Sequence, residues 1–261
     1  MMMIEQFFRP DSVDQALELK RRYQEDAVWF AGGSKLNATP TRTDKRIAIS
    51  LQDLELEWID WDNGALRIGA MTRLQPLHDA RYLPAALREA IGFIYSRHLR
   101  NQSTLGGEIA AQQQESVLLP VLLALDAQLV CGDGETLSLE SYLADPRDRL
   151  LTEIIIKDPF RPCATRKVSR SQAGLTVVTA AVALTEHGGM CIALDGVADK
   201  ALRLRDVETQ TREGTELEQA VANALFPQDD IRGSAAYKRY ITGVVVADLY
   251  ADCLMAGEVV V

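Results

Sequence analysis

The sequence predicts an α+β protein with two domains. The chain has 261 residues, 47% of them hydrophobic, so it can bury a sizeable core, and at about 100–200 residues per domain its length indicates two domains. Segments with the helical spacing of apolar residues are mixed with short apolar runs typical of strands. A segment bracketed by Pro159 and Pro162 marks the predicted boundary between domains at 1–160 and 161–261.

The first part of the chain, up to about residue 55, predicts a small α/β subdomain. Ser12 is a good N-cap for a helix that continues to about Tyr23. Two apolar runs, at residues 27–31 and 47–49, follow as predicted strands. The first of these runs stops at Gly32-Gly33, where the chain is expected to turn.

Residues 56–160 predict a second, mixed subdomain. Residues 58–69 read as a hairpin, because Asn63-Gly64 suits a tight two-residue turn between two apolar runs. The other predicted elements are helices near 74–79, 84–91 and 115–125, and strands near 127–131 and 154–157.

The last hundred residues, roughly, predict a smaller domain with an antiparallel sheet. Residues 176–186 and 190–194 flank Gly188-Gly189 as a second hairpin. Helices are expected at about 216–225 and 234–253.

Charge and composition exclude several classes of partner. The formal net charge is -9, and no basic cluster is longer than Lys20-Arg21-Arg22, so phosphate backbones and anionic lipids are repelled. The N-terminus lacks a basic region followed by an apolar one, and no stretch of about 18–20 apolar residues is evident. We therefore expect a cytoplasmic protein with neither nucleic acid nor membrane as a partner.

The metal-ligating residue types are scattered. Cys131, Cys163, Cys191 and Cys253 lie far apart in the chain, and the three histidines show no ligand spacing. No catalytic triad or carboxylate dyad is evident either. The sequence therefore predicts no metal site and no catalytic side chain.

Two glycine-containing segments are the candidate ligand site. Residues 31–37 read Ala-Gly-Gly-Ser-Lys-Leu-Asn after a predicted strand, and residues 100–110 surround Gly106-Gly107 with hydroxyl, amide and guanidinium groups. Glycines allow close backbone approach to a ligand, and backbone N–H groups can bind a pyrophosphate. A Gly-Gly pair after a strand is more often a plain turn, so each segment alone indicates little.

Taken together, the two segments resemble a known family. Ala-Gly-Gly-Ser after a strand, followed farther on by Arg-Asn-x-x-Thr-Leu-Gly-Gly, is similar to the FAD-binding subunits of molybdenum hydroxylases, the medium subunits of xanthine and carbon monoxide dehydrogenases. Further similar stretches at 68–72, 118–127, 150–154, 166–170 and 234–239 extend the resemblance over nearly the whole chain. It implies a two-lobed VAO/PCMH-type FAD-binding domain, followed by a smaller C-terminal α/β domain.

The resemblance also implies which residues bind FAD. Leu151 would pack near the flavin, and a cation at Arg166 or Lys167 would lie near its polar edge, although these two could equally be a surface pair. The implied cofactor-binding residues are Ala31, Gly32, Gly33, Ser34, Lys35, Leu36, Asn37, Asn101, Ser103, Thr104, Leu105, Gly106, Gly107, Glu108, Leu151, Arg166 and Lys167.

The chain departs from the family pattern after its second Gly-Gly. Where the family has Asn, then Ser-Pro, then an Asp that binds flavin-nucleotide hydroxyls, this chain has Glu108, Gln113-Gln114 and Val117. Val117 cannot accept a hydrogen bond, and losing one to a charged acceptor costs about 1.5–3 kcal/mol. Glu108 or Glu115 is a candidate substitute.

The function implied by the resemblance is electron transfer. The FAD subunit would pass electrons from iron–sulfur clusters on a partner to a soluble acceptor, with NAD as one candidate. The implied partners are a molybdopterin-binding large subunit and a 2Fe-2S small subunit. The alternatives are a flavin-free structural or assembly subunit that keeps the fold, and a stand-alone flavin-binding protein.

Overall fold

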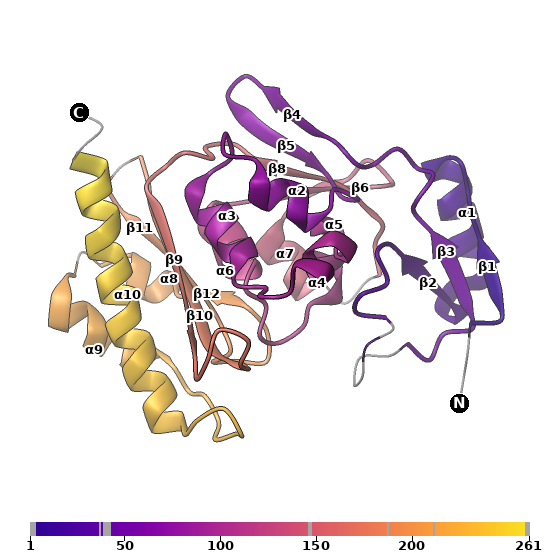
Figure 1. Ribbon diagram of the computed structural model, residues 1–261. Helices are drawn as coiled ribbons and strands as arrows, with labels where there is room; N and C mark the ends of the chain where they lie inside the picture. The colour runs from indigo at the N-terminus through magenta and orange to yellow at the C-terminus, as the bar shows by residue number, and fades with distance from the viewer. Residues whose placement is uncertain are drawn as a thin grey trace.

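The computed structural model describes residues 4–36, 38, 43–145, 148–186, 188–210 and 212–258, and in this part of the chain three sheets form. Figure 1 shows the N-terminal sheet at one end of the molecule, the second sheet with its helices in the middle, and the third sheet with the long C-terminal helix at the other end. The two termini therefore lie on opposite sides of the molecule.

The N-terminal unit is a three-stranded parallel sheet with one covering helix. Its order is β1 (Gln6–Phe8), β3 (Ile47–Ser50), β2 (Ala27–Phe30), with α1 (Val13–Tyr23) and a short 3-10 helix (Gln24–Asp26) between strands. The predicted cap is confirmed, because Ser12 Oγ accepts a hydrogen bond from the Gln15 N–H at 3.4 Å. Ala16 of α1 packs on Ile47 and Ile49 in a small core of its own.

The central sheet is antiparallel and five-stranded. Its order is β4 (Ile59–Asp62), β5 (Ala65–Gly69), β8 (Leu151–Ile156), β6 (Gln128–Cys131), β7 (Thr136–Ser138). Asn63 and Gly64 both have positive φ, 50° and 84°, as a tight hairpin turn of the predicted kind requires.

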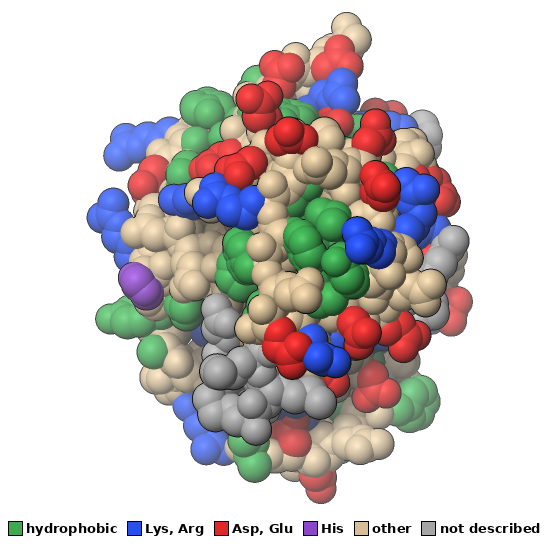
Figure 2. All heavy atoms as spheres, turned by 90° about the vertical axis from the view of Figure 1, so that its right-hand side faces the viewer, with side chains coloured by type: hydrophobic (Ala, Val, Ile, Leu, Met, Phe, Trp, Pro, Cys, Tyr) green, Lys and Arg blue, Asp and Glu red, His purple; other side chains and the backbone are tan. Residues whose placement is uncertain are grey.

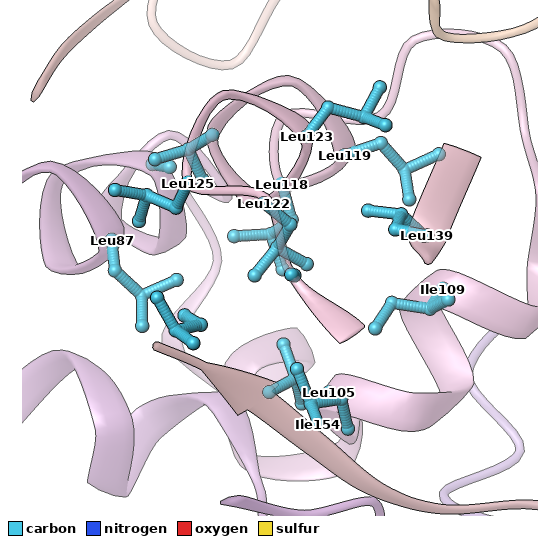
Figure 3. Close-up of a cluster of buried hydrophobic side chains, with 14 of the residues drawn as sticks. Leu87, Leu105, Ile109, Leu118, Leu119, Leu122, Leu123, Leu125, Leu139 and Ile154 are labelled. Carbon is cyan, nitrogen blue, oxygen red and sulfur yellow. The ribbon is translucent and has the colours of Figure 1, made fainter. Parts of the chain in front are cut away.

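Short helices cover the central sheet and enclose the main core. They are α2 (Leu74–Asp79), α3 (Ala85–Gly92), α4 (Arg97–Gln102), α5 (Leu105–Ala111), α6 (Leu119–Ala124) and α7 (Leu139–Ala144). Figure 3 shows Leu118 and Leu122 near α6 pointing toward Leu105 and Ile109 of α5 and Ile154 of β8. This apolar contact fixes α5, and with it the second glycine segment, against the sheet.

The C-terminal sheet is antiparallel, as predicted. Its order is β12 (Leu202–Arg203), β11 (Met190–Asp195), β10 (Thr176–Leu184), β9 (Cys163–Ser169), followed by α8 (Arg205–Glu208), α9 (Gly214–Ala224) and α10 (Ala235–Glu258). β10 is buried on both faces: Ala181 and Ala183 join the core around α6, whereas Val178, Ala180 and Val182 face the core under α10. A continuous apolar run is the expected pattern for such a strand.

The last helix corrects one expectation. Residues 235–257 are long and apolar enough, by length and composition, to span a membrane, contrary to the expectation that no stretch of this kind occurs. In the structure α10 packs along β10 and α9, with Val246, Leu249 and Cys253 buried in the C-terminal core. Packing of one face against the sheet accounts for its apolar composition.

Two local predictions are wrong for physical reasons. The helix expected from residue 115 begins only at Leu119, because Glu115 has a left-handed backbone (φ 75°) that no helix accommodates. The segment around Gly106-Gly107, where no helix is predicted from the sequence, is the first part of helix α5. The predicted domain boundaries fall between β3 and β4 and between β8 and β9, and the division into domains stays a prediction.

Candidate functional site

A cleft separates the N-terminal unit from helix α5, and both glycine segments line it. The walls of this central cleft include Trp29, Gly33, Gly107, Arg149 and Leu151. Two hollows adjoin it and share wall residues with it, one beside Asn101 and one beside Val117. We call these the Asn101 pocket and the Val117 pocket. Together the three form an elongated groove that runs along both glycine segments.

The first glycine segment turns sharply at the end of β2. Gly33 has a φ of 71°, which favours glycine. A Cβ at Gly32 would overlap the carbonyl oxygen of Gln102 at the end of α4. Gly32 is therefore required because the backbone of Gln102 lies against it. Gly33 is favoured because its φ is positive.

The second glycine segment is built on a helix cap. Thr104 Oγ1 accepts a hydrogen bond from the Gly107 N–H at 3.1 Å and so begins α5. A Cβ on Gly106 would lie 2.7 Å from the Ala70 Cβ, and one on Gly107 would lie 2.8 Å from Thr104 Oγ1. Gly106 is thus explained by the packing of α5 on the segment after β5, and both glycines line the central cleft.

Two polar contacts join the glycine segments to each other. Ser103 Oγ donates to Ser34 Oγ at 2.9 Å, and Lys35 Nζ lies 3.5 Å from Glu108 Oε1. Glu108 is almost fully buried, and this burial raises the pKa of its carboxyl group, while the neighbouring Lys35 and Ser103 act in the opposite direction. The spacing of the two motifs in the chain is therefore matched by direct side-chain contact in space.

The remaining predicted residues fall into separate places. Leu36 lines both the central cleft and the Val117 pocket, and Asn101 lines its own pocket. Leu105 is fully buried in the main core and lines none of the three hollows described here. Asn37 lies outside the described residues.

The structure distinguishes the two adjacent cations on β9. Arg166 points to α10, where it pairs with Asp248 at 2.9 Å and Asp252 at 3.2 Å. Lys167, on the opposite face of the strand, lies 3.5 Å from the carbonyl oxygen of Phe93, and burial lowers its pKa while Glu115 opposes that shift. Its Nζ also donates to the carbonyl oxygen of Gln172 at 3.2 Å. Of the two cations, Lys167 therefore faces the side of the sheet where the Val117 pocket lies, and it is not among the residues that line that pocket.

Reasoning from the sequence missed several polar residues of the groove. The Trp29 indole N–H and Arg149 Nη2 are buried and have no hydrogen-bond partner within the described part of the chain, and both residues line the central cleft. Arg149 is held in place by Glu135 and Asp145. A buried donor without a partner costs about 1–3 kcal/mol, so these donors fit a bound group that is rich in acceptors, such as a nucleotide.

Val117 is the position where the expected acceptor is missing. It is 7% exposed and lines its pocket together with Glu108, Gln113 and Gln114. Glu115, one of the candidate substitutes, is engaged by Arg232 at 2.7 Å. Glu108 is thus the buried carboxylate of the groove that lies on the same pocket wall.

No group of three or more His, Cys, Asp or Glu residues is arranged to hold a metal ion among the described residues. The four cysteines are free, and three of them are buried.

Figure 2 shows the face over the N-terminal unit, where acidic and basic side chains are interspersed around a group of hydrophobic ones. The described side chains on that face form no continuous basic surface.

Comparison with known proteins identifies the class of this chain. A family model described as the FAD binding domain in molybdopterin dehydrogenase matches residues 2–158. The chain therefore belongs to this family, whose cofactor is FAD, and both the resemblance and the fold class predicted from the sequence are confirmed.

Individual relatives agree with the family. The chain is 83% identical to the protein YgfM of Escherichia coli strain K12, over 98% of this chain and 99% of that protein. It is 28% identical to the carbon monoxide dehydrogenase medium chain of Afipia carboxidovorans, over 92% and 93% of the two chains. A solved carbon monoxide dehydrogenase chain from Hydrogenophaga pseudoflava superposes with a TM-score of 0.84 at 26% identity, covering 97% of this chain and 99% of that one. The Afipia and Hydrogenophaga relatives of this chain are dehydrogenase chains, and none of these matches indicates a specificity like that of xanthine dehydrogenase.

Proposed function

We propose that this chain is the FAD-binding electron-transfer subunit of a multi-subunit oxidoreductase of the molybdenum hydroxylase type. It takes electrons from iron–sulfur clusters on a partner chain and passes them to a soluble acceptor, with NAD as one candidate. The observation that carries the proposal is the elongated groove, in which two glycine segments are joined by the Ser34–Ser103 hydrogen bond and the Lys35–Glu108 ion pair.

The shape and the donors of the groove suit a dinucleotide. Gly33 and Gly107 place no side chain on their parts of the wall of the central cleft, so that a pyrophosphate can approach the backbone there. Trp29 and Arg149, which each have a buried donor without a hydrogen-bond partner among the described residues, line the same cleft. We assign the nucleotide half of FAD to the central cleft and the flavin ring to the Val117 pocket. In this assignment Leu151, which lines the central cleft, lies beside the nucleotide half and not beside the flavin as the resemblance implies.

Lys167 supports this orientation. A flavin reduced by two electrons tends to become anionic, and a fixed positive charge stabilises that form. Lys167 is on the face of β9 toward the Val117 pocket, whereas Arg166 is occupied by two carboxylates of α10. We therefore assign the cation near the flavin to Lys167.

The proposed partners follow from the relatives. This chain spans 93% of a carbon monoxide dehydrogenase medium chain, so it corresponds to one subunit of such an enzyme. We propose a molybdopterin-binding large subunit and a 2Fe-2S small subunit as its partners, in a cytoplasmic complex. In that arrangement this chain needs no metal ligands of its own.

The test is electron flow in the complex isolated from its native host. Addition of the oxidisable substrate without an acceptor should bleach the visible flavin absorbance, and a soluble acceptor should restore it. The matched variant is Lys167→Met, which should still assemble and bind FAD but restore the absorbance at a different rate. A complex whose flavin stays oxidised while its iron–sulfur clusters are reduced contradicts the proposal.

One observation favours a second candidate function, that of a structural subunit without flavin. Val117 places an apolar side chain where an acceptor was expected, on the wall of the proposed flavin pocket. In this case the purified chain is colourless and does not bind added FAD, but it still assembles with its partner subunits. Full assembly of a complex that lacks flavin distinguishes this candidate from the first.

A further inference from the structure

The connection between α5 and α6 forms one wall of the Val117 pocket. Gln112, Gln113, Gln114, Glu115, Ser116 and Val117 all line it. Two of these residues, Gln112 and Glu115, have positive φ values of 42° and 75° without being glycine. Such backbone persists only where other contacts hold it. The left-handed backbone of Gln112 is that of an ordinary helix C-cap, so the contacts that hold Glu115 decide the shape of this connection, which we call the 112–118 segment.

The main hold comes from the C-terminal domain. Asp195, the last residue of β11, is fully buried, and its two carboxylate oxygens accept hydrogen bonds from consecutive backbone N–H groups. Oδ1 accepts from Glu115 at 3.0 Å and Oδ2 from Ser116 at 3.1 Å. One side chain thus fixes two successive peptide groups at the bend of the segment.

The same contact sets the start of the following helix. Ser116 Oγ accepts hydrogen bonds from the N–H groups of Leu118 and Leu119 at 3.3 and 3.2 Å. Asp195 holds the backbone of Ser116, and Ser116 in turn holds the first turn of α6. The wall of the pocket is therefore tied on one side to β11 and on the other to the main core.

Among the residues that the structure describes, no cation is bonded directly to Asp195. The charged groups that face it are Glu115, which repels it, and Arg232, which pairs with Glu115 at 2.7 Å and with Asp230 at 2.5 Å. Its neighbour on β10 is the uncharged Thr179. A buried carboxylate held mainly by amide N–H groups is costly to keep. An apolar residue at this position would be buried at a lower cost in free energy. What the carboxylate contributes is therefore the conformation of the 112–118 segment.

We propose that Asp195 is a positioning residue for the flavin site, which fixes the 112–118 segment as the wall of the Val117 pocket and thereby sets the affinity for FAD. This inference rests on the proposed function only in taking FAD as the occupant of the groove. Asp195 acts through the backbone of Glu115 and Ser116 and makes no contact with the cofactor itself.

The protonation state of Asp195 gives the proposal a distinctive signature. Burial raises its pKa to about 6, against the opposing effect of the backbone N–H groups. A protonated carboxyl loses one of its two acceptor positions, so the hold on the segment weakens as the pH falls below that value. Glu108 on the same pocket also has a raised pKa, and the two titrations have to be separated by variants.

The first experiment compares the full-length protein with Asp195→Asn and with Asp199→Asn, an exposed aspartate nearby that serves as the matched control. FAD is titrated by flavin fluorescence well above pH 6. Asp195→Asn keeps one acceptor and presents an amide donor to the other N–H group. We expect a dissociation constant weaker by about tenfold to hundredfold, with no change in the control. An unchanged affinity in a folded Asp195→Asn protein overturns the proposal.

Two further measurements keep the proposal open to refutation. Hydrogen exchange of peptides that cover the 112–118 segment needs no FAD, and it should be faster in Asp195→Asn but unchanged in Asp199→Asn. If Asp195→Asn does not fold, hydrogen exchange of the same peptides in the Glu108→Gln protein, which needs no FAD, should become faster relative to the intrinsic rate as the pH is lowered through about 6. A flat profile in that protein overturns the positioning role. Failure of the wild-type protein to bind FAD at all would instead refute the proposed function, while the exchange measurement still tests Asp195.

Discussion

Ser103 Oγ donates a hydrogen bond of 2.9 Å to Ser34 Oγ, and these two residues are 69 positions apart in the chain. Ser34 follows the first Gly-Gly pair, and Ser103 immediately precedes the cap of the helix that carries the second. The bond therefore joins the two walls of the groove at the point where the glycine segments meet. This hydrogen bond shows that the two sequence motifs, which are far apart in the chain, are in direct contact in the folded protein.

The Ser34–Ser103 bond should be worth little to folding and more to FAD binding. A net hydrogen bond contributes about 0.5–1.5 kcal/mol, so Ser34→Ala and Ser103→Ala should each weaken FAD binding by roughly two- to tenfold. The double variant should lose less than the sum of the two, because each single change already breaks the same bond. Calorimetric titration of the three proteins checks this, and strict additivity would show that the serines act independently.

Gly106→Val should disrupt the fold rather than the cofactor contact alone. The new side chain would meet the Ala70 Cβ and carbonyl oxygen at less than van der Waals distance, and overpacking of this kind costs about 1–3 kcal/mol or more. Gly107→Ala meets only the movable hydroxyl of Thr104 and should be milder. Thermal unfolding of both variants tests the order. A Gly106→Val protein with wild-type stability and full flavin content would contradict this reading of α5.

The buried Glu108 should make the protein less stable as the pH rises. Its folded-state pKa is raised above the usual value near 4.5, so the native state binds the proton more tightly than the unfolded state between these two values. The free energy of unfolding should therefore fall as the pH rises through that window. Glu108→Gln should reduce this fall without removing it, because Asp195 titrates with the same sign. If the free energy of unfolding, measured with a chemical denaturant, depends on pH in the same way in Glu108→Gln and in the wild-type protein, Glu108 is not the buried acid described here.

Substitution of the two neighbouring cations of β9 should affect the reduction potential of the flavin differently. Lys167→Met should lower the reduction potential of the bound flavin, because the anionic reduced form loses its positive neighbour. Arg166→Met removes only exposed ion pairs with α10, which are worth roughly 0.2–1 kcal/mol each, and should leave the potential unchanged. Spectroelectrochemical titration of the two proteins measures this. A shift in Arg166→Met alone would reverse the assignment.

The sequence predicts the locally determined parts of this fold well. The cap at Ser12 and the turn at Asn63-Gly64 depend on residues within a few positions of each other, and both appear as expected. Helix α5 was missed because two glycines lower helix propensity, and the Thr104 cap together with packing on Ala70 compensates for them. Tertiary contact here overrides the local signal.

The candidate site was predictable only in part. The two glycine segments were found from their pattern, but the sequence did not separate Arg166 from Lys167, since that depends on which face of β9 meets α10. Asp195 was missed because its partners are 79 and 80 positions away. The available signal was an acidic residue that ends the fully buried strand β11 just before Gly196.

The central claim, that the groove binds FAD, is tested most directly by titration of the purified full-length chain with FAD and, separately, with ADP. We predict that the chain binds one FAD, that the flavin band is retained through gel filtration, and that excess ADP competes because it occupies the central cleft. A folded protein that stays colourless, does not alter the fluorescence of added FAD and binds no ADP would contradict the account.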